Sequence, residues 1–98
     1  MYYIKFGTPA KKDLKRLSRA AQNEIEKIHL PRLQIDARKQ GDRLKGEFRA
    51  YWKCAFTVGG IAYRIAYEIK EEELLVSVIM IGTRENFYKE LKRRLRSS

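Results

Sequence analysis

The sequence has few of the residues that build disulfide-linked or metal-linked small proteins. Among its 98 residues there is one cysteine, Cys54, and one histidine, His29. A single cysteine cannot form an intramolecular disulfide, and these two residues together cannot supply the common zinc ligand sets. We therefore expect a fold without disulfides that uses no metal and no cofactor.

Long hydrophobic runs are also missing. No apolar segment approaches the roughly 18–20 residues that a membrane span needs. The first residues, from Met1 to Lys5, lack the apolar segment and small-residue cleavage site of a secretory signal peptide. There are no repeats, linkers or low-complexity segments. These absences favour a cytoplasmic protein without a membrane partner, and the length favours one domain over residues 1–98.

Acidic residues are scarce relative to basic ones. The chain has 22 Lys and Arg against 12 Asp and Glu, which gives a formal net charge of +10. A hydrophobic content of 44% and an aromatic content of 11% argue against disorder despite this charge. The basic excess is concentrated in the two terminal segments. Such a charge favours a polyanionic partner, which could be nucleic acid, the ribosome or an acidic protein.

The first third of the chain predicts a strand followed by two helices. Residues 2–6 alternate in the manner of a short strand. Thr8 offers a capping hydroxyl and Pro9 a proline in the first turn, which is typical of a helix start. Ser18 can cap a second helix, and Pro31 should end or kink that helix.

The rest of the chain predicts an antiparallel meander and a final helix. The predicted strands and helix span 48–57, 61–69, 74–81 and about 85–95. Gly59 and Gly60 form the first hairpin turn. The last strand is apolar on both faces, so it should be central or covered on both sides. The predicted fold class is α+β, in the order β-α-α-β-β-β-α. It has a four-stranded, mainly antiparallel sheet, an N-terminal helical hairpin on one face and a C-terminal helix.

The hairpin turn determines which side chains share a face of the sheet. With Gly59 and Gly60 as the turn, Val58 lies opposite Ile61 and the pairs step outward from there. One face collects the large apolar residues, namely Trp52, Cys54, Phe56, Tyr63, Ile65, Tyr67 and Ile69. The other face collects cations and small residues, namely Arg49, Tyr51, Lys53, Ala55, Arg64, Ala66 and Glu68. The first set predicts a core under the two helices, and the second a shallow positive floor suited to a phosphate.

Three short motifs, in this order of elements, resemble the RelE/ParE toxin superfamily. They are Leu44-Lys45-Gly46 before the second predicted strand, Tyr63-Arg64-Ile65-Ala66-Tyr67 in the third and Gly82-Thr83-Arg84 after the fourth. The resemblance covers nearly the whole chain. It implies a toxin of a type II toxin–antitoxin system, neutralised by a cognate antitoxin encoded beside it. Members like the RelE branch cut messenger RNA in the ribosomal A site, whereas members like the ParE branch inhibit DNA gyrase.

The resemblance to the RelE branch also implies catalytic residues. Arg64 and Arg84 match arginines that hold the scissile phosphate and offset its developing charge. Tyr88 matches a tyrosine that stacks on and orients a base, and Lys53 matches a lysine of the second strand. The usual second basic residue of that strand is absent, because Tyr51 stands two positions before Lys53.

The reaction implied by the resemblance is attack of a ribose 2′-OH on the adjacent phosphate without a metal. It needs a base near the 2′-OH and an acid near the leaving oxygen. Lys53 can act as base only if its pKa is depressed, a direction that nearby Arg64 favours and Glu68 opposes. Glu68 is itself an alternative base. His29 falls among core positions of the second helix, so we interpret it as structural.

The RNA must also be bound at positions other than the scissile phosphate. The candidates for this role are Lys45, Arg49, Tyr51 and Lys92. The alternative for the basic helix faces is a solvated surface or one that attracts an acidic antitoxin. Arg64 could likewise be a strand residue paired with Glu68 or Glu47, and Lys53 one paired with Glu68. Two functions stay open beside the endonuclease. One is a ParE-like gyrase inhibitor that binds without cutting RNA. The other is a catalytically decayed member that reaches DNA only indirectly, in an antitoxin–operator complex.

Overall fold

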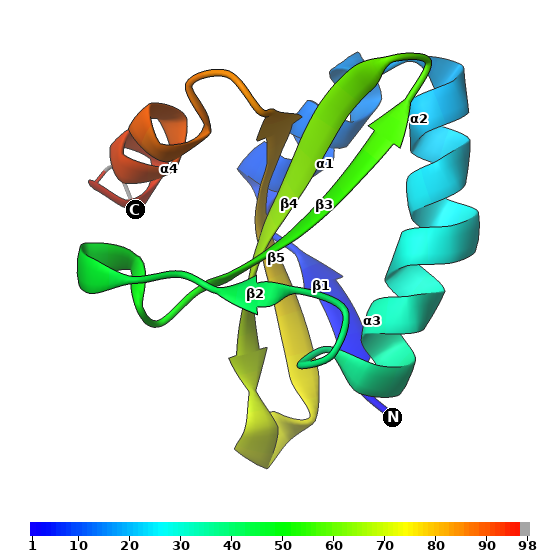
Figure 1. Ribbon diagram of the computed structural model, residues 1–98. Helices are drawn as coiled ribbons and strands as arrows, with labels where there is room; N and C mark the ends of the chain where they lie inside the picture. The colour runs from blue at the N-terminus through cyan, green and yellow to red at the C-terminus, as the bar shows by residue number, and fades with distance from the viewer. Residues whose placement is uncertain (97–98) are drawn as a thin grey trace.

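The structure is a computed structural model that describes residues 1–96, and its centre is a five-stranded mixed sheet in the order β1-β5-β4-β3-β2. The strands are β1 Tyr3–Phe6, β2 Asp42–Arg43, β3 Trp52–Val58, β4 Ile61–Lys70 and β5 Leu75–Thr83. The helices are α1 Thr8–Arg16, α2 Arg19–Glu24, α3 Leu30–Asp36 and α4 Phe87–Arg96. Strand β1 runs parallel to β5, and all other pairs are antiparallel. In Figure 1, α1 to α3 lie on one side of the sheet and α4 on the other.

The predicted α+β class is confirmed, but the predicted count of four strands is wrong by one. The additional strand, β2, has two residues and pairs with the start of β3. So short a segment carries no alternation that a sequence pattern could show. The strand predicted from residue 48 begins at Trp52, because Gly46–Phe48 forms a 3₁₀ turn with Gly46 at a φ of 64°. Arg49 and Tyr51 therefore precede the paired strand instead of lying on its face.

Of the two helix caps predicted near the amino terminus, one is confirmed and one is wrong. Ser18 caps α2 as predicted, accepting a hydrogen bond from the Ala21 N–H at 3.1 Å. Thr8 does not cap α1, because the capping position is Gly7 and Thr8 is already helical.

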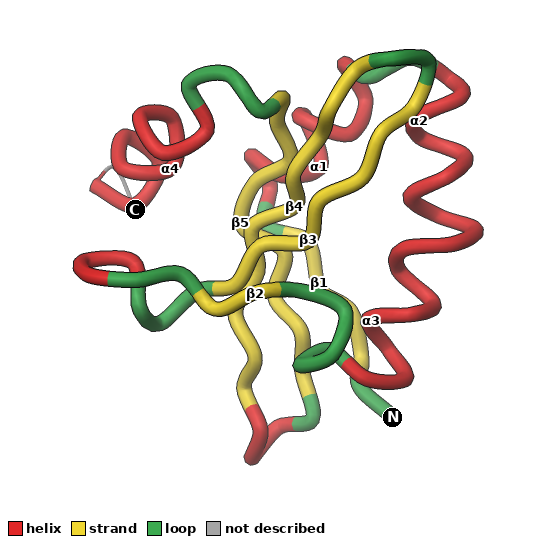
Figure 2. The backbone as a smooth tube through the Cα atoms, in the orientation of Figure 1, coloured by secondary structure: helices red, strands yellow, loops and turns green. Residues whose placement is uncertain are grey.

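The helix that contains Pro31 does not end there. A π-helical turn, Ile25–His29, joins α2 to α3, and the Leu30 N–H bonds to the Ile25 carbonyl. This wider turn accommodates the missing N–H and the ring of the proline, so one helical rod runs along the right of Figure 2.

The predicted register of the β3–β4 hairpin is confirmed. Val58 pairs with Ile61, and Lys53 with Ala66. The apolar face of this hairpin packs against α1 to α3 in a first core, whose fully buried members include Ala21, Ile25, Leu33, Ile65 and Tyr67. The Tyr67 hydroxyl donates to the Ala37 carbonyl at 2.7 Å and so joins the sheet to the end of the helical rod.

A second, smaller core lies between the opposite face and α4. Its buried members are Leu44, Ala66, Met80, Phe87 and Leu91. A bulge in the β4–β5 pairing, between Ala66 and Tyr67, shifts the alternation of β5 so that Val78 faces the first core and Met80 the second. The prediction that this strand is covered on both sides is thus confirmed. The predicted open floor is partly wrong, because α4 buries Ala66 completely.

Candidate functional site

An ion pair links α4 to the first helix, near the other end of the chain. Asp13 of α1 is 9% exposed, and its carboxylate accepts hydrogen bonds from both Nη atoms of Arg94 at 2.9 and 3.1 Å. The same carboxylate accepts the Ile81 N–H at 3.1 Å, and Arg94 also donates to the Ile79 carbonyl at 3.0 Å. Helix α4 is therefore joined to α1 and β5 by a bidentate, mostly buried pair.

The first turn of α4 brings Tyr88 to two of the predicted cations. The Lys53 Nζ donates to the Tyr88 hydroxyl oxygen at 3.5 Å and lies 6.0 Å from the ring centroid. The guanidinium carbon of Arg64 lies 5.9 Å from the Tyr88 ring and 5.4 Å from the Phe87 ring. Tyr88 remains 44% exposed. Three of the four predicted catalytic residues thus form one cluster, with the cations close to aromatic faces.

A groove opens beside this cluster. Its volume is about 650 Å³, and its lining residues are Asp42, Arg43, Leu44, Lys45, Lys53 and Tyr88. The Phe48 ring lies 5.9 Å from the Tyr88 ring and extends the aromatic wall. An anion that enters this groove meets Arg43 and Lys45 from one segment, Lys53 from β3 and an aromatic ring on which a planar group can stack.

The fourth predicted residue, Arg84, lies further along the same face. Its N–H bonds to the Ala62 carbonyl at 2.9 Å, which continues the β4–β5 ladder beyond the pairing of Arg64 with Gly82. Because alternate residues share a face, Arg84 and Arg64 belong to the same side of the sheet. Arg84 lines a separate hollow near the hairpin tip, beside Ile61 and Ala62.

The predicted RNA-binding residues divide between different surroundings. Lys45 lines the groove. Arg49 donates from Nη1 to the Gly46 carbonyl at 3.3 Å, within its own turn. Tyr51 packs against the second core, in a hollow beside Ile79 and Leu95, instead of beside Lys53. Lys92 lies on α4 and pairs with Glu47 at 3.7 Å.

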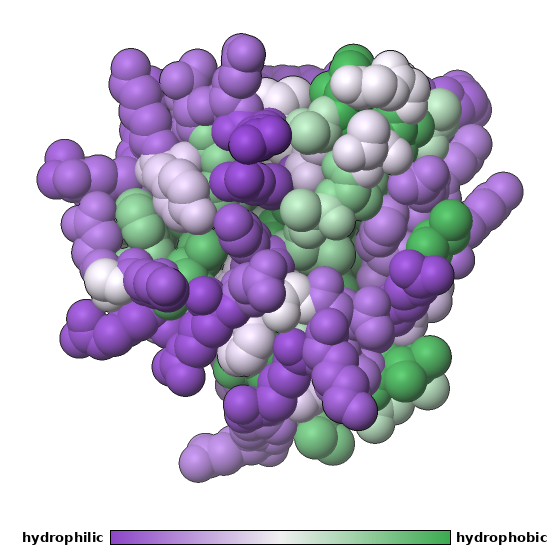
Figure 3. All heavy atoms as spheres, in the orientation of Figure 1, coloured by the Kyte–Doolittle hydropathy of each residue, from purple (hydrophilic) through white to green (hydrophobic). Residues whose placement is uncertain are grey.

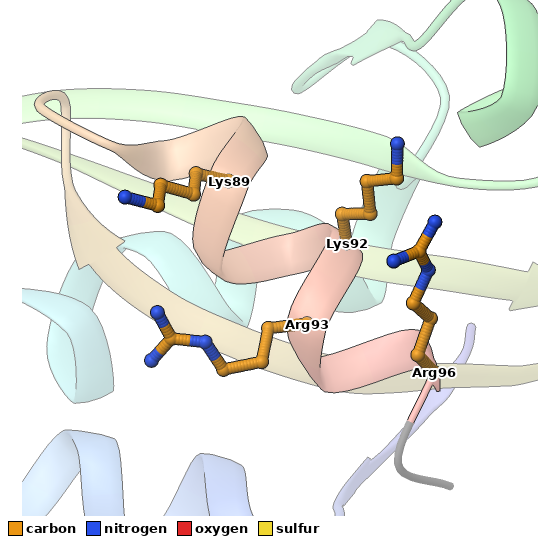
Figure 4. Close-up of a pocket in the computed structure, with 4 residues that line it drawn as sticks. All are labelled: Lys89, Lys92, Arg93 and Arg96. Atoms are coloured by element: carbon orange, nitrogen blue, oxygen red, sulfur yellow. The ribbon is translucent and has the colours of Figure 1, made fainter.

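The outer surface of α4 is strongly basic. Lys89, Lys92, Arg93 and Arg96 surround a shallow hollow there. Figure 4 shows Lys89 and Arg93 extending to one side of the helix and Lys92 and Arg96 to the other, each pair four residues apart. Hydrophilic side chains dominate this region in Figure 3. Residues four apart rise about 6 Å along a helix, so each pair offers two cations in a row to a polyanion.

The simpler structural roles hold for several residues. The His29 Nε2 lies 3.0 Å from a Glu24 carboxylate oxygen, and its ring centroid lies 4.2 Å from that of Phe56 in the first core, with the ring planes tilted by 30°. Cys54 is buried, and burial raises the pKa of its thiol. Glu68 pairs with Ser77, beyond the bulge, and does not line the groove. Within residues 1–96 the alternative ion pairs do not form, since Arg64 and Lys53 lie against Tyr88 and Glu47 pairs with Lys92.

Three features of this site escaped sequence analysis. Phe48 joins the aromatic wall, Asp42 lines the groove, and the pair between Asp13 and Arg94 holds α4. Asp13 is the one acidic residue of α1 and lies on its buried stripe with Ala10, which was its one visible signal. Within the described part of the chain no group of three or more potential metal ligands occurs, and none of its helices is long and apolar enough to cross a bilayer.

Comparisons with known proteins agree on one group. A family model described as the ParE-like toxin of type II bacterial toxin–antitoxin systems matches residues 4–92. A chain of the RelBE2 toxin–antitoxin complex from Mycobacterium tuberculosis is 22% identical, with a TM-score of 0.76 over 85% of this chain and 98% of that one.

Two structures from E. coli are similar as well. A substituted RelE toxin in the free state is 24% identical, with a TM-score of 0.77 over 96% of this chain and 97% of that one. A chain of the intact RelBE complex is 25% identical, with a TM-score of 0.73 over 87% and 99%. No curated protein sequence matches the chain.

Proposed function

Since the chain belongs to the ParE-like toxins of type II bacterial toxin–antitoxin systems, we propose that it cuts messenger RNA on the ribosome. The attacking group is a ribose 2′-OH and the target is the adjacent phosphate, so the products are a cyclic phosphate and a free 5′-OH. This is the chemistry to which a groove with cations and an exposed aromatic ring is suited.

The observation that carries the proposal is the convergence of Lys53 and Arg64 on Tyr88. Stacking of a base on an aromatic ring stabilises a complex by about 1–3 kcal/mol and tolerates any base. A base stacked on Tyr88 brings its phosphate to the side where the two cations lie. Arg64 then offsets the charge that develops on the phosphate oxygens, and Lys53 donates to the leaving oxygen.

Arg84 is assigned a supporting part in the same step. It lies opposite Ala62, two ladder positions beyond Arg64 and on the same face. A guanidinium at this position reaches along the RNA backbone toward the phosphate that Arg64 holds. Two arginines acting together distribute the negative charge of the transition state over several N–H donors.

The second partner is an antitoxin. Similar structures are those of toxin–antitoxin complexes, and family membership makes a cognate antitoxin the expected neutralising partner. On the toxin, the basic surface of α4 and Lys45 provide contacts to RNA backbone that do not depend on sequence. The ribosome supplies the RNA, and operator DNA is reached only through the antitoxin.

A second candidate function is inhibition of DNA gyrase without RNA cleavage. Two observations favour it. The matching family model is the ParE-like one, and β3 carries one lysine in the cluster, since Tyr51 packs toward the second core. A protein that acts by binding alone cuts no RNA, so Arg64 would have no cleavage step to support.

Primer extension on a defined messenger RNA in a purified translation system separates these functions. Wild-type protein is compared with the Arg64→Ala, Arg84→Ala double variant, and with Arg19→Ala as a matched change outside the site. We expect cuts that require ribosomes, persist in Arg19→Ala and fall at least a hundredfold in the double variant. Cuts that persist in the double variant would reject the assigned site. No cuts by folded, antitoxin-free wild type would reject the endonuclease, and a gyrase supercoiling assay would then test the second candidate.

A further inference from the structure

We propose that Asp42 is the general base of this reaction and accepts the proton of the attacking 2′-OH, an inference that rests on the proposed RNA cleavage. Asp42 is the one carboxylate among the described residues that line the groove with Lys53 and Tyr88. A base for this step must lie in the same groove as the group that protonates the leaving oxygen, here Lys53, because the attacking and leaving oxygens flank one phosphorus atom.

The pairing of β2 with β3 determines the position of Asp42. Asp42 and Lys53 are direct partners in this antiparallel pair, so their side chains share a face and their Cα atoms are about 4.5–5.5 Å apart. The preceding residue, Gly41, lies so close to the Tyr67 hydroxyl and the Lys53 carbonyl that a side chain there would clash with both. This close approach holds the backbone of Asp42 against β3.

The other candidate bases are engaged elsewhere. Lys53 is a donor toward the Tyr88 hydroxyl, which suits a role as acid. His29 packs on Phe56 in the first core, and Glu24 binds its ring nitrogen. Glu68 lies beyond the bulge and outside the groove lining. A carboxylate beside a lysine gives the groove one proton acceptor and one proton donor. The reaction needs both, because the 2′-OH loses a proton and the leaving oxygen gains one.

The step balances with these two groups. The Asp42 carboxylate removes the 2′-OH proton as the 2′-oxygen forms its bond to phosphorus. The bond from phosphorus to the 5′-oxygen breaks, and that oxygen takes a proton from the Lys53 ammonium. The products are the 2′,3′-cyclic phosphate and a 5′-OH, and proton exchange with water restores the carboxylate and the ammonium.

A change of leaving group distinguishes a base from an acid. A 5′-bridging sulfur at the scissile position leaves without protonation, so it removes the need for an acid and keeps the need for a base. Single-turnover cleavage of ribosome-bound messenger RNA with oxygen or sulfur at this position is measured for wild type, Asp42→Asn and Lys53→Ala. Asp36→Asn, on α3 and outside the groove, is the matched control.

We expect Asp42→Asn to slow both substrates by about 10²–10⁴-fold, while the defect of Lys53→Ala is recovered with sulfur. RNA affinity of Asp42→Asn should be equal or higher, since a negative charge leaves a groove that binds an anion. An Asp42→Asn rate within twofold of the Asp36→Asn control, or one recovered by sulfur, would overturn the assignment. Failure of wild type to cut either substrate would instead overturn the proposed function, and this inference with it. Equal far-UV circular dichroism of the variants establishes that folding is not the cause.

Discussion

The two faces of the sheet are both lined by apolar side chains but differ in what covers them. The first core lies under three helical segments and contains large, fully buried residues such as Ile65 and Tyr67. The second core lies under α4 alone, and its edge opens into the groove beside Tyr88. Burial on the first face stabilises the fold, whereas the incomplete cover on the second leaves cations and an aromatic ring available to a ligand. The site thus lies where the apolar cover ends.

The largest expected effect on the free energy of unfolding is at the first core, whose side chains are enclosed on all sides. Ile65→Ala should lower the free energy of unfolding by about 4 kcal/mol, because β-sheet and helices enclose the side chain on all sides and the cavity cannot collapse. Leu91→Ala is the counterpart under α4, where one helix can shift to fill the space, and about 2–3 kcal/mol is expected. Urea unfolding of both variants measures the difference. Equal losses would contradict the distinction between the faces.

The next effect breaks the link between the two ends of the chain. Asp13→Ala leaves the Arg94 guanidinium and the Ile81 N–H without their shared acceptor, so we expect a loss of about 3 kcal/mol. Asp36→Ala removes a half-buried carboxylate that lies 3.8 Å from the Lys39 ammonium and accepts the Lys39 N–H at 3.3 Å, and its loss should not exceed about 1 kcal/mol. Denaturant unfolding gives both values. A small loss for Asp13→Ala would show that apolar contacts alone hold α4.

A smaller effect concerns the buried hydroxyl of the first core. Tyr67→Phe removes the hydrogen bond to the Ala37 carbonyl and should cost about 1–2 kcal/mol at neutral pH. Tyr63→Phe is the matched change at a buried ring on the same strand. Thermal unfolding of both variants at pH 7 tests this, and an equal effect would show that the Ala37 bond contributes nothing specific.

The contribution of Tyr67 to the stability of the fold should decrease at high pH. Burial raises the pKa of the Tyr67 phenol, and the nearby Cys54 and Asp42 charges add to the rise. The folded state therefore favours the neutral form, so this contribution is present below the ordinary tyrosine pKa of about 10 and is lost as the pH rises beyond it. The stability of wild type should fall more steeply than that of Tyr67→Phe above pH 10. Parallel curves would contradict the assignment.

The smallest effect is expected at the exposed turn between β4 and β5. Glu71 accepts hydrogen bonds from the Tyr2 hydroxyl and the Arg38 guanidinium, and these bonds lower the pKa of its carboxyl. A lowered pKa contributes stability above the ordinary carboxyl value that is lost as the pH falls. Glu71→Gln should therefore differ slightly from wild type at pH 7 and less at pH 3, in thermal unfolding at low salt. A larger difference at pH 3 would reverse this sign.

Much of the sheet was predictable because its signals are local. The glycine pair at residues 59 and 60 determined the β3–β4 register, and alternation then assigned Ile65 and Tyr67 to the core face. The same reasoning missed β2, which is two residues long, and it took Arg49 and Tyr51 as strand residues when they lie in and after a turn. Local patterns fail where a partner strand, and not the segment itself, decides the pairing.

The sequence by itself determined the α+β class, the hairpin register and the apolar face of the hairpin, since each depends on periodicity over neighbouring residues. Only the tertiary structure decided that Tyr88 meets Lys53 and Arg64. That contact requires α4 to dock on the sheet, where it packs in the second core and where Arg94 pairs with Asp13, 81 positions away. No pattern within one element records a bond between two elements, so the contact of Tyr88 with these two cations becomes visible only once the chain is folded.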